Sequence, residues 1–328
     1  MKQKLLFSLF ALLTATMARA DVEINETNFP DTNFRNWVLN QTYGKDSVLT
    51  NSEIAGIRSI TVWNVGISSL KGIEFFTAIT LLNCKTNQLT SLDVSKCTAL
   101  EYLDCGFNKL TSLDISGCRL LDHLYCYENQ LTEIDVSGHT ALFQLNCYRN
   151  RLTSLNVSGC TTLKILYCHY NQLTSLDVSG CTELRTLYCF NNQLTSIKVS
   201  GCLVLGDLYC YGNKINEAEM GKLVDNLPTR YGSFRVIYGN NDQNVMNTFQ
   251  VEDATAKGWR PQWYYEDNWQ VYAGSEPSPD GIGLTIGSSP MNEGSWYDLS
   301  GRRVSGKFAK RGIYIKNGKK IATNLPLK

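Results

Sequence analysis

The chain has 328 residues, of which 43% are apolar, with 25 glycines and 7 prolines, as in an ordinary folded protein. Its formal net charge is +1, so the molecule as a whole has no electrostatic bias toward nucleic acid or an anionic membrane. We therefore expect a folded protein with a sizeable core and no general affinity for polyanions.

The first twenty residues, MKQKLLFSLFALLTATMARA, have the features of a secretory signal peptide. Two lysines precede an apolar run that begins at Leu5, and Ala18 and Ala20 form a small-residue cleavage site. We predict cleavage after Ala20. The run is shorter than the roughly 20 apolar residues of a spanning helix, and no later stretch qualifies. We therefore expect a protein that is secreted or lies on the outer cell surface, without a transmembrane segment.

The next segment, residues 21–56, is expected to form an N-terminal cap. Its pattern predicts a helix over residues 32–40, with Phe34, Trp37 and Val38 on the apolar side. The run Thr50-Asn51-Ser52-Glu53 matches a capping box, so a second, short helix should begin there.

Residues 57–216 consist of a repeat of 21 or 22 residues. Cysteines recur every 21 residues from Cys84 to Cys210, and asparagines do so from Asn87 to Asn213. A second cysteine series, at positions 97, 118, 160, 181 and 202, has His139 in its gap. Each unit reads approximately L-x-x-L-x-C-x-x-N-x-L-T-x-L-D-V-S-G-C-T-x, the leucine-rich-repeat pattern. We predict a β-rich leucine-rich-repeat solenoid of the α/β class with about eight coils. It should have a parallel concave sheet, short extended or 3₁₀ convex segments, and caps at both ends.

Alternation along each short strand places successive side chains on opposite faces. Leu124 and Cys126 should therefore face inward, and Tyr125 and Tyr127 outward. One coil cannot bury its apolar side chains alone, so neighbouring coils must stack, about 4.8 Å apart. We expect the recurring asparagine to bind buried backbone groups of the turn after each strand, which is a structural role.

The twelve cysteines, in a chain with a secretion signal, suggest disulfides. The two ladders, however, have odd numbers of members and lie at inward apolar positions, where a free cysteine packs as a small hydrophobe. Cysteines on adjacent coils come close enough for a bond, but their parallel Cβ vectors would strain its dihedral angle. We favour reduced core thiols, with disulfides as the alternative.

The sequence contains no motif that predicts a metal site, a cofactor or catalysis. Cys118, His139 and Cys160 lie on three consecutive coils, too far apart for one zinc ion. Residues 42–53 distantly resemble a calcium loop but lack carboxylates at Thr42 and Gly44. No nucleophile elbow, phosphate loop or metal-spaced cluster appears, so we expect neither a cofactor nor an enzyme.

The outward positions beside the ladder cysteines are rich in aromatic residues. Of the fourteen positions directly before or after Cys84 through Cys210, eight hold Tyr or Phe and one holds His169, where the chain-wide 11% predicts one or two. With three neighbouring rings they are the predicted ligand-binding residues: Tyr102, Phe107, Tyr125, Tyr127, Tyr148, Tyr167, His169, Tyr170, Tyr188, Phe190, Tyr209 and Tyr211. Exposed aromatic strips typically mark interaction sites.

Charges are scattered along this strip, so we expect a protein or glycan ligand and no nucleic acid. They are Lys85, Arg149, Asp104, Glu128 and Asp207. Cross-strand aromatic packing that only stiffens the sheet is the alternative interpretation.

Residues 217–274 are expected to form a C-terminal α/β cap over the last coil. The pattern predicts helices from Asn216 to about Leu227 and over 248–257, and strands over 234–238 and around 263–272. Residues 275–292, which include SEPSPDGIG, have the composition of a linker. Residues 293–328 are expected to form a basic β-hairpin tail, because from Trp296 onward nine Lys and Arg face one acid and alternate with strand-forming residues.

Several of these stretches resemble a known family. The repeats LTSLDVSGCTEL and LYCFNNQLTSI, the lead-in GIEFFTAITLLNC and the tail YDLSGRRV…RGIYIKNGKKI resemble secreted leucine-rich-repeat proteins of Bacteroidetes, including internalin-like surface proteins. The tail is similar to a C-terminal type IX secretion sorting domain. The resemblance implies a surface-displayed or released protein that adheres to host cells, other bacteria or matrix, with a tail recognised by export machinery. It implies no ligand and no catalytic residue. A passive surface scaffold without a specific ligand is the alternative function, and an enzyme is the least favoured.

Overall fold

The structure is a computed structural model that describes residues 21–276 and four short strands beyond them, at 296–297, 303–304, 312–316 and 319–323. The predicted signal peptide, residues 277–292 of the predicted linker and most of the predicted tail lie outside the described residues.

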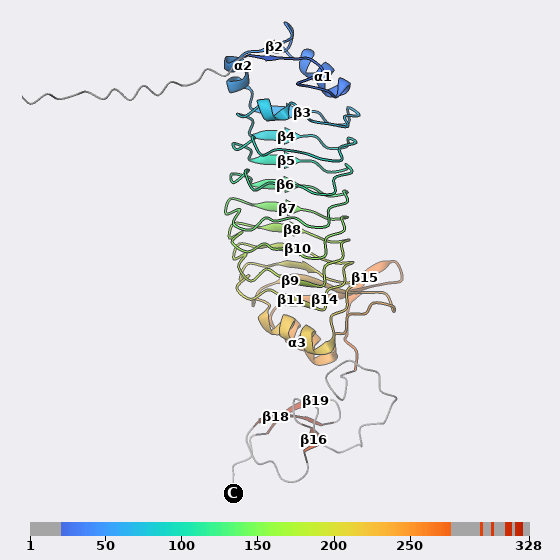
Figure 1. The fold of residues 1–328 in the computed structure, drawn as a ribbon. Helices are drawn as coiled ribbons and strands as arrows, with labels where there is room; N and C mark the ends of the chain where they lie inside the picture. Colours follow the sequence, from blue (N-terminus) through green and yellow to red (C-terminus); the bar gives the residue numbers. More distant parts are fainter. Residues whose placement is uncertain (1–20, 277–295, 298–302, 305–311, 317–318, 324–328) are drawn as a thin grey trace, which may run out of the picture.

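The centre of the molecule is a stack of coils, and each coil contributes one three-residue strand to a continuous parallel sheet (Figure 1). The strand pairs are one repeat apart, so that Leu82 lies beside Leu103 and Leu103 beside Leu124. The strands are β3 (Ser59–Thr61), β4 (Leu81–Asn83), β5 (Tyr102–Asp104), β6 (His123–Tyr125), β7 (Gln144–Asn146), β8 (Ile165–Tyr167), β10 (Thr186–Tyr188) and β12 (Asp207–Tyr209). The predicted leucine-rich-repeat solenoid is confirmed.

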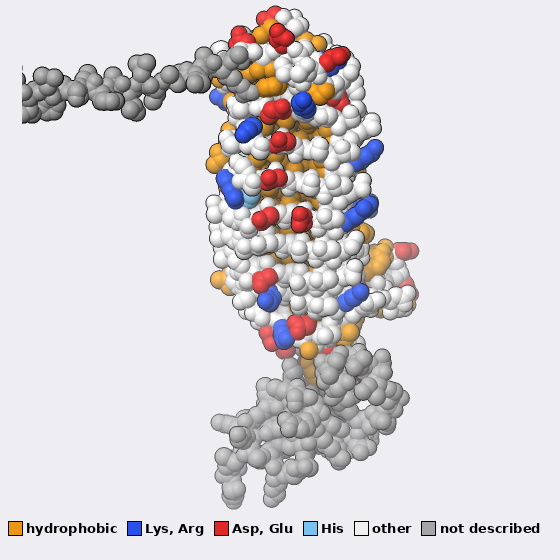
Figure 2. All heavy atoms as spheres, in the orientation of Figure 1, with side chains coloured by type: hydrophobic (Ala, Val, Ile, Leu, Met, Phe, Trp, Pro, Cys, Tyr) orange, Lys and Arg blue, Asp and Glu red, His pale blue; other side chains and the backbone are white. Residues whose placement is uncertain are grey.

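The convex side consists of short extended segments and turns. Two of these segments pair as β9 (Ser175–Asp177) and β11 (Ser196–Lys198), and the 3₁₀ helix η1 (Ile73–Phe75) lies in the lead-in coil. The exposed Asp93, Asp114 and Asp135 accept a bond from the backbone N–H of the serine two residues later, at 2.8–2.9 Å. On the face drawn in Figure 2, acidic side chains follow one another along the coils, with basic side chains on either side.

The interior is filled by leucines and by both cysteine ladders. All twelve cysteines are buried and are present as free thiols. Because burial disfavours the thiolate, the pKa of Cys97 is raised to about 12 and that of Cys160 to about 11. His139 takes the place of a thiol in the second ladder and is equally buried, with its Nε2 atom 3.3 Å from the Ile115 carbonyl oxygen.

The asparagine series ties each coil to the preceding one. The Asn129 amide donates to the carbonyls of Cys126 in its own coil and Cys105 in the preceding coil, at 3.1 and 3.0 Å. Its Oδ1 atom accepts the Leu110 N–H at 2.9 Å. The same three bonds recur at Asn108, Asn150, Asn171, Asn192 and Asn213. The predicted structural role of this residue is confirmed, because its amide satisfies backbone groups that water cannot reach.

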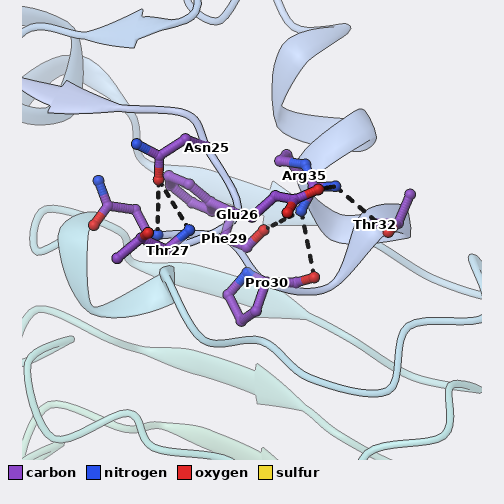
Figure 3. Close-up of polar contacts among 8 residues, drawn as sticks. Asn25, Glu26, Thr27, Phe29, Pro30, Thr32 and Arg35 are labelled. Carbon is purple, nitrogen blue, oxygen red and sulfur yellow. Dashed lines mark hydrogen bonds and ion pairs between the residues drawn. The ribbon is translucent and has the colours of Figure 1, made fainter.

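The N-terminal end is closed by helices α1 (Thr32–Leu39) and α2 (Asn51–Gly56) and by the strand pair β1 (Val22–Glu23) and β2 (Val48–Leu49). The capping box predicted at Thr50 and Glu53 is present. Figure 3 shows how Arg35 of α1 fixes the entry to this helix, by donating 2.7 and 3.3 Å bonds to the carbonyls of Phe29 and Pro30. Phe34 and Val38 are buried, as predicted for this helix, and Trp37 packs against the core.

The C-terminal cap continues the sheet. Helix α3 (Glu217–Asn226) is followed by β13 (Gly232–Tyr238), α4 (Thr248–Ala256), β14 (Trp259–Tyr265) and β15 (Asn268–Val271). Strands β13 and β14 extend the sheet in parallel, and β15 ends it in antiparallel orientation. Asn244 repeats the bonds of the asparagine series on Cys210 and Ile215, at 2.8 and 3.0 Å, which the sequence pattern had not predicted.

The four strands beyond residue 276 form an antiparallel sheet in the order β17-β16-β18-β19. They are β16 (Trp296–Tyr297), β17 (Arg303–Val304), β18 (Gly312–Lys316) and β19 (Lys319–Thr323). Across the part of the chain that the structure describes, the helices are too short or too polar to cross a bilayer.

Replacing Asn171 with alanine should lower the free energy of unfolding by about 3 kcal/mol, because two carbonyls and one N–H lose their buried partner. Gln172→Ala is the matched control, because the side chain of Gln172, next to Asn171 in the chain, is exposed. This replacement should change the free energy of unfolding by no more than about 0.5 kcal/mol. Urea unfolding followed by circular dichroism measures both. Equal stabilities of the two variants would contradict the assigned role.

The native protein should be inert to Ellman's reagent, and twelve thiols should react once guanidinium has unfolded it without reductant. The physical reason is that buried thiols stay protonated and out of reach. A total well below twelve after unfolding would show that the ladders contain disulfides.

Candidate functional site

The cysteines of the first ladder, from Cys84 to Cys210, follow the strands of the concave sheet. The residues on either side of each of them form two columns of side chains along that sheet. We call the residues before the cysteines the first column and those after them the second column. In both, the parallel register brings equivalent residues of neighbouring coils side by side, so that Tyr188 lies between Tyr167 and Tyr209. The columns are therefore a direct consequence of the one-repeat step of the sheet.

The first column is a continuous stack in its C-terminal half. The ring centroids of Tyr167 and Tyr188 are 4.8 Å apart, and those of Tyr188 and Tyr209 are 4.2 Å apart with an angle of 6° between planes. The guanidinium carbon of Arg235 lies 4.3 Å from the ring centroid of Tyr209 and 4.6 Å from that of Trp269. Arginine and tryptophan from the cap thus continue the column that the repeats begin.

The second column is an unbroken series of seven rings. Adjacent centroids are 4.3–5.3 Å apart, and the planes differ by 1–24°. In order, the rings are those of Tyr127, Tyr148, His169, Phe190, Tyr211, Tyr238 and Tyr264. Offset stacking of this kind contributes about 0.5–1.5 kcal/mol per pair beyond burial, so the column also stiffens the sheet.

The residues beside the cysteines face outward as expected but are more covered than an exposed strip: eleven of the fourteen are half-buried, and three near the N-terminal end of the strip are buried. Tyr127 is only 7% exposed, and Asp104 and Gly106 are buried as well. The reason is that Gly106 has no side chain, so the Tyr127 ring lies over its Cα; a Cβ there would be 2.7 Å from the ring. Lys85 covers the same end of the column, with Nζ 5.5 Å from the Tyr127 centroid.

Two further rings project from the rim of the concave face. Phe107 and Tyr170 are 44% and 43% exposed. Both have φ near +50°, as do Glu128 and Arg149 at the equivalent position of other coils. Thr86, Asn191 and Gly212 share this conformation at the same position of their coils, so the turn of the repeat imposes it whatever the side chain. Arg149 pairs with Glu128 at 3.2 Å and lies 5.0 Å from the centroid of Tyr170.

Tyr102 and Tyr125 belong to a separate group nearer the N-terminal end. Their ring centroids are 5.4 Å apart, and both contact His123, which in turn stacks on Phe143. Asn146 occupies the first column between Tyr125 and Tyr167, so the stack is interrupted there. Most of the predicted residues are therefore brought together on one face, in two groups.

Over the concave face lies a shallow and largely open hollow of about 640 Å³, which we call the trough. It is lined by Glu128, Asn146, Tyr148, Arg149, Tyr167, His169, Tyr170, Tyr188, Phe190, Tyr209, Tyr211 and Arg235. Four buried side-chain N or O atoms of the described residues have no hydrogen-bond partner, and three belong to this lining: Asn146 Oδ1, His169 Nδ1 and Arg235 Nε. Such atoms are rare in folded proteins and call for a structural or functional explanation.

Burial keeps several of the stacked rings in their neutral form. Burial raises the pKa of Tyr125 to about 12 and also raises the pKa values of Tyr188 and Tyr211, so their phenols keep their protons. Burial, with a smaller contribution from the nearby Arg149, lowers the pKa of His169 to about 4. Neutral rings can stack without repulsion along both columns.

In the described part of the chain, no three His, Cys, Asp or Glu side chains come together as metal ligands would. Cys118 instead contacts the carbonyl oxygens of Val94 and Cys97, at 3.5 and 3.7 Å.

Sequence reasoning missed the cap residues that complete the columns, namely Arg235, Tyr238, Tyr264 and Trp269. The sequence carries a partial signal for Arg235 alone, because alternation about the inward Phe234 turns it outward, whereas its place beside Tyr209 depends on the pairing of β12 with β13. Alternation would turn Tyr238 inward, and it lies outward because the register shifts between Arg235 and Ile237.

Comparisons with known proteins agree with this architecture. The family model described as "Leucine Rich repeats (2 copies)" matches residues 161–202. The functional domain of InlJ from Listeria monocytogenes, which includes a cysteine ladder, is 31% identical, with a TM-score of 0.60. That similarity covers 73% of this chain and 56% of the InlJ chain, so this chain spans little more than half of the InlJ structure.

An internalin, InlF, from the same species has a TM-score of 0.55 over 76% of this chain and 79% of that chain. At 22% identity, this second likeness concerns the fold alone. No curated protein sequence matches the chain. The chain is thus internalin-like in its repeats and fold.

Protein stability should fall as the pH is lowered from about 6.5 to about 4, in part because of His169. In this window the unfolded histidine binds a proton and the folded one does not, so protonation favours unfolding. We expect His169→Phe, which keeps a ring in the column, to remove about 1–2 kcal/mol of this loss, after allowance for the partial exposure of the ring. Urea unfolding of both proteins at pH 7.5 and 4.5 measures the difference. An identical loss in both would contradict the assignment.

Proposed function

We propose that this leucine-rich-repeat solenoid is a secreted or cell-surface adhesion protein that binds a protein ligand in the trough of its concave face. The observation that carries the proposal is the trough itself. Its lining brings aromatic side chains of both columns together with the side chains of Arg149 and Arg235. Rigid aromatic side chains with neutral hydroxyls provide contact area at low entropic cost, as at many protein interfaces.

Stacking of the rings within the sheet does not explain every aromatic residue on this face. Cross-strand stacking would stiffen the sheet equally well beneath a polar rim, yet Phe107 and Tyr170 project outward from left-handed backbone positions. The exposed ring of Tyr170 adds apolar area to the lining of the trough, whereas Phe107 lies outside that lining, nearer the N-terminal end of the same rim. The backbone conformation is shared by every coil, so the feature that packing leaves unexplained is the exposed aromatic side chain of Tyr170 at this position.

The similarity to the functional domain of InlJ supports a binding role, since leucine-rich-repeat proteins of the internalin type are typically protein-binding. The predicted signal peptide, residues 1–20, supports the proposed location outside the cell or on its surface. We further propose that the basic tail, residues 293–328, is recognised by type IX export machinery, as its resemblance to sorting domains implies.

Replacing the rim and the middle of the first column should abolish adhesion. The test variant combines Phe107→Ser, Tyr170→Ser, Tyr167→Ala and Tyr188→Ala. The control combines Leu120→Ser and Leu203→Ser, two leucines that are 54% and 74% exposed and do not line the trough. Beads coated with each protein are counted on epithelial monolayers, bacterial lawns and immobilised matrix proteins. We expect at least a tenfold reduction for the test variant only.

Circular dichroism and the unfolding temperature establish that both variants are folded. Adhesion by the folded test variant at the control level would favour the passive scaffold, as would beads that bind no better than uncoated ones.

A further inference from the structure

We propose that the ligand in the trough is an extended acidic segment of a partner protein, with a carboxylate bound by Arg235. This inference rests on the proposed function and adds to it the chemical class of the ligand.

Arg235 is held rigidly but carries an unpaired charge. Its guanidinium lies between the rings of Tyr209 and Trp269, at 4.3 and 4.6 Å from their centroids, so its plane and position are fixed by packing on both sides. Among the described residues, no carboxylate lies within ion-pair distance of it, and its buried Nε atom has no hydrogen-bond partner. The planar fork of an arginine fixed in this way is suited to bidentate binding of a carboxylate.

Arg149, the other arginine of the lining, differs in this respect. Its charge is already balanced by Glu128 at 3.2 Å, on the rim of the same trough. Among the lining residues, the positive charge without a carboxylate partner is therefore at the C-terminal end of the trough, at Arg235. Asp207 lies on the same face and acts on Tyr167 and Tyr188, so the positive potential is confined to the surroundings of Arg235. An acidic group on the ligand would complement it there.

The orientation of the rings favours a peptide over a sugar. Each interior ring of the columns has both faces covered by its neighbours, as with His169 between Tyr148 and Phe190 at 4.7 and 4.3 Å. The trough therefore presents ring edges and hydroxyls. Sugars stack on open ring faces, whereas the electropositive edge of an aromatic ring attracts carbonyl and carboxylate oxygens. Peptide carbonyls and acidic side chains supply such oxygens along their whole length.

The dimensions of the trough fit a short extended segment. Its first-column lining runs across five successive strands, from Asn146 on β7 to Arg235 on β13. Four steps of about 4.8 Å between strands give a length of about 19 Å. An extended chain advances about 3.3 Å per residue, so about six residues fill this length.

The test uses the full chain as bait for a phage-displayed library of random heptapeptides. We expect the selected peptides to be enriched in Asp and Glu. A synthetic peptide with the selected consensus should bind at least tenfold more weakly to Arg235→Gln, and its Glu→Gln counterpart at least tenfold more weakly to the unchanged protein. Arg185→Gln, at an exposed arginine that does not line the trough, is the matched control and should bind normally.

The peptide substitution keeps the test decisive even where Arg235→Gln proves unstable, because it needs no change in the protein. Three results would overturn the inference: selected peptides without acidic enrichment, equal binding of the Glu and Gln peptides, or binding of carboxylated glycans on an array with no peptide selected. The proposed function is judged separately by bead adhesion. A loss of adhesion with the aromatic variant, alongside any of these three results, leaves that function standing and removes only the acidic ligand.

Discussion

Stacking of coils in strict register is the constraint on which the rest of this molecule depends. A single coil holds a few leucines and two thiols, too little apolar surface to be stable alone, and only contact with the coils on both sides buries them. The asparagine at each turn adds a directional component, because its amide bridges backbone groups of two successive coils. Burial supplies most of the stabilisation, and the amide bonds allow only one alignment of each coil on its neighbour.

The same alignment produces the candidate site. Side chains that point outward from equivalent positions must lie about one strand spacing apart, which for planar rings is close to the stacking distance. Packing and ligand binding are therefore compatible uses of one set of residues here. The stacks fix the rings, and fixed rings lose little entropy when a ligand arrives. What distinguishes the trough from mere packing is its unsatisfied chemistry, above all the unpaired guanidinium of Arg235 between two aromatic faces.

Features that depend on one repeat, or on a few adjacent residues, could be predicted from the sequence. The solenoid follows from the spacing of the cysteines and asparagines, and the short helix after Thr50 follows from its local capping pattern. The helix after Asn216 begins at the next residue for the same reason. The buried side chains Leu124 and Cys126 follow from alternation along one strand.

Features that depend on contacts between coils, or on chain outside the repeat, could not be predicted. The burial of Tyr127 requires the missing side chain of Gly106 on the preceding coil. Arg235 continues the first column and Asn244 continues the asparagine series. Both follow helix α3 in the chain, so neither lies at the 21-residue spacing of the repeats. Trp269 arrives on an antiparallel strand. The interruption at Asn146 has its own consequence: excising one whole repeat around it would join Tyr125 to Tyr167 and Tyr127 to His169 as immediate neighbours. The length of the candidate binding surface is thus modular. Unequal recombination between two repeats of the gene would shorten or lengthen it by whole coils and leave the contacts between neighbouring coils intact.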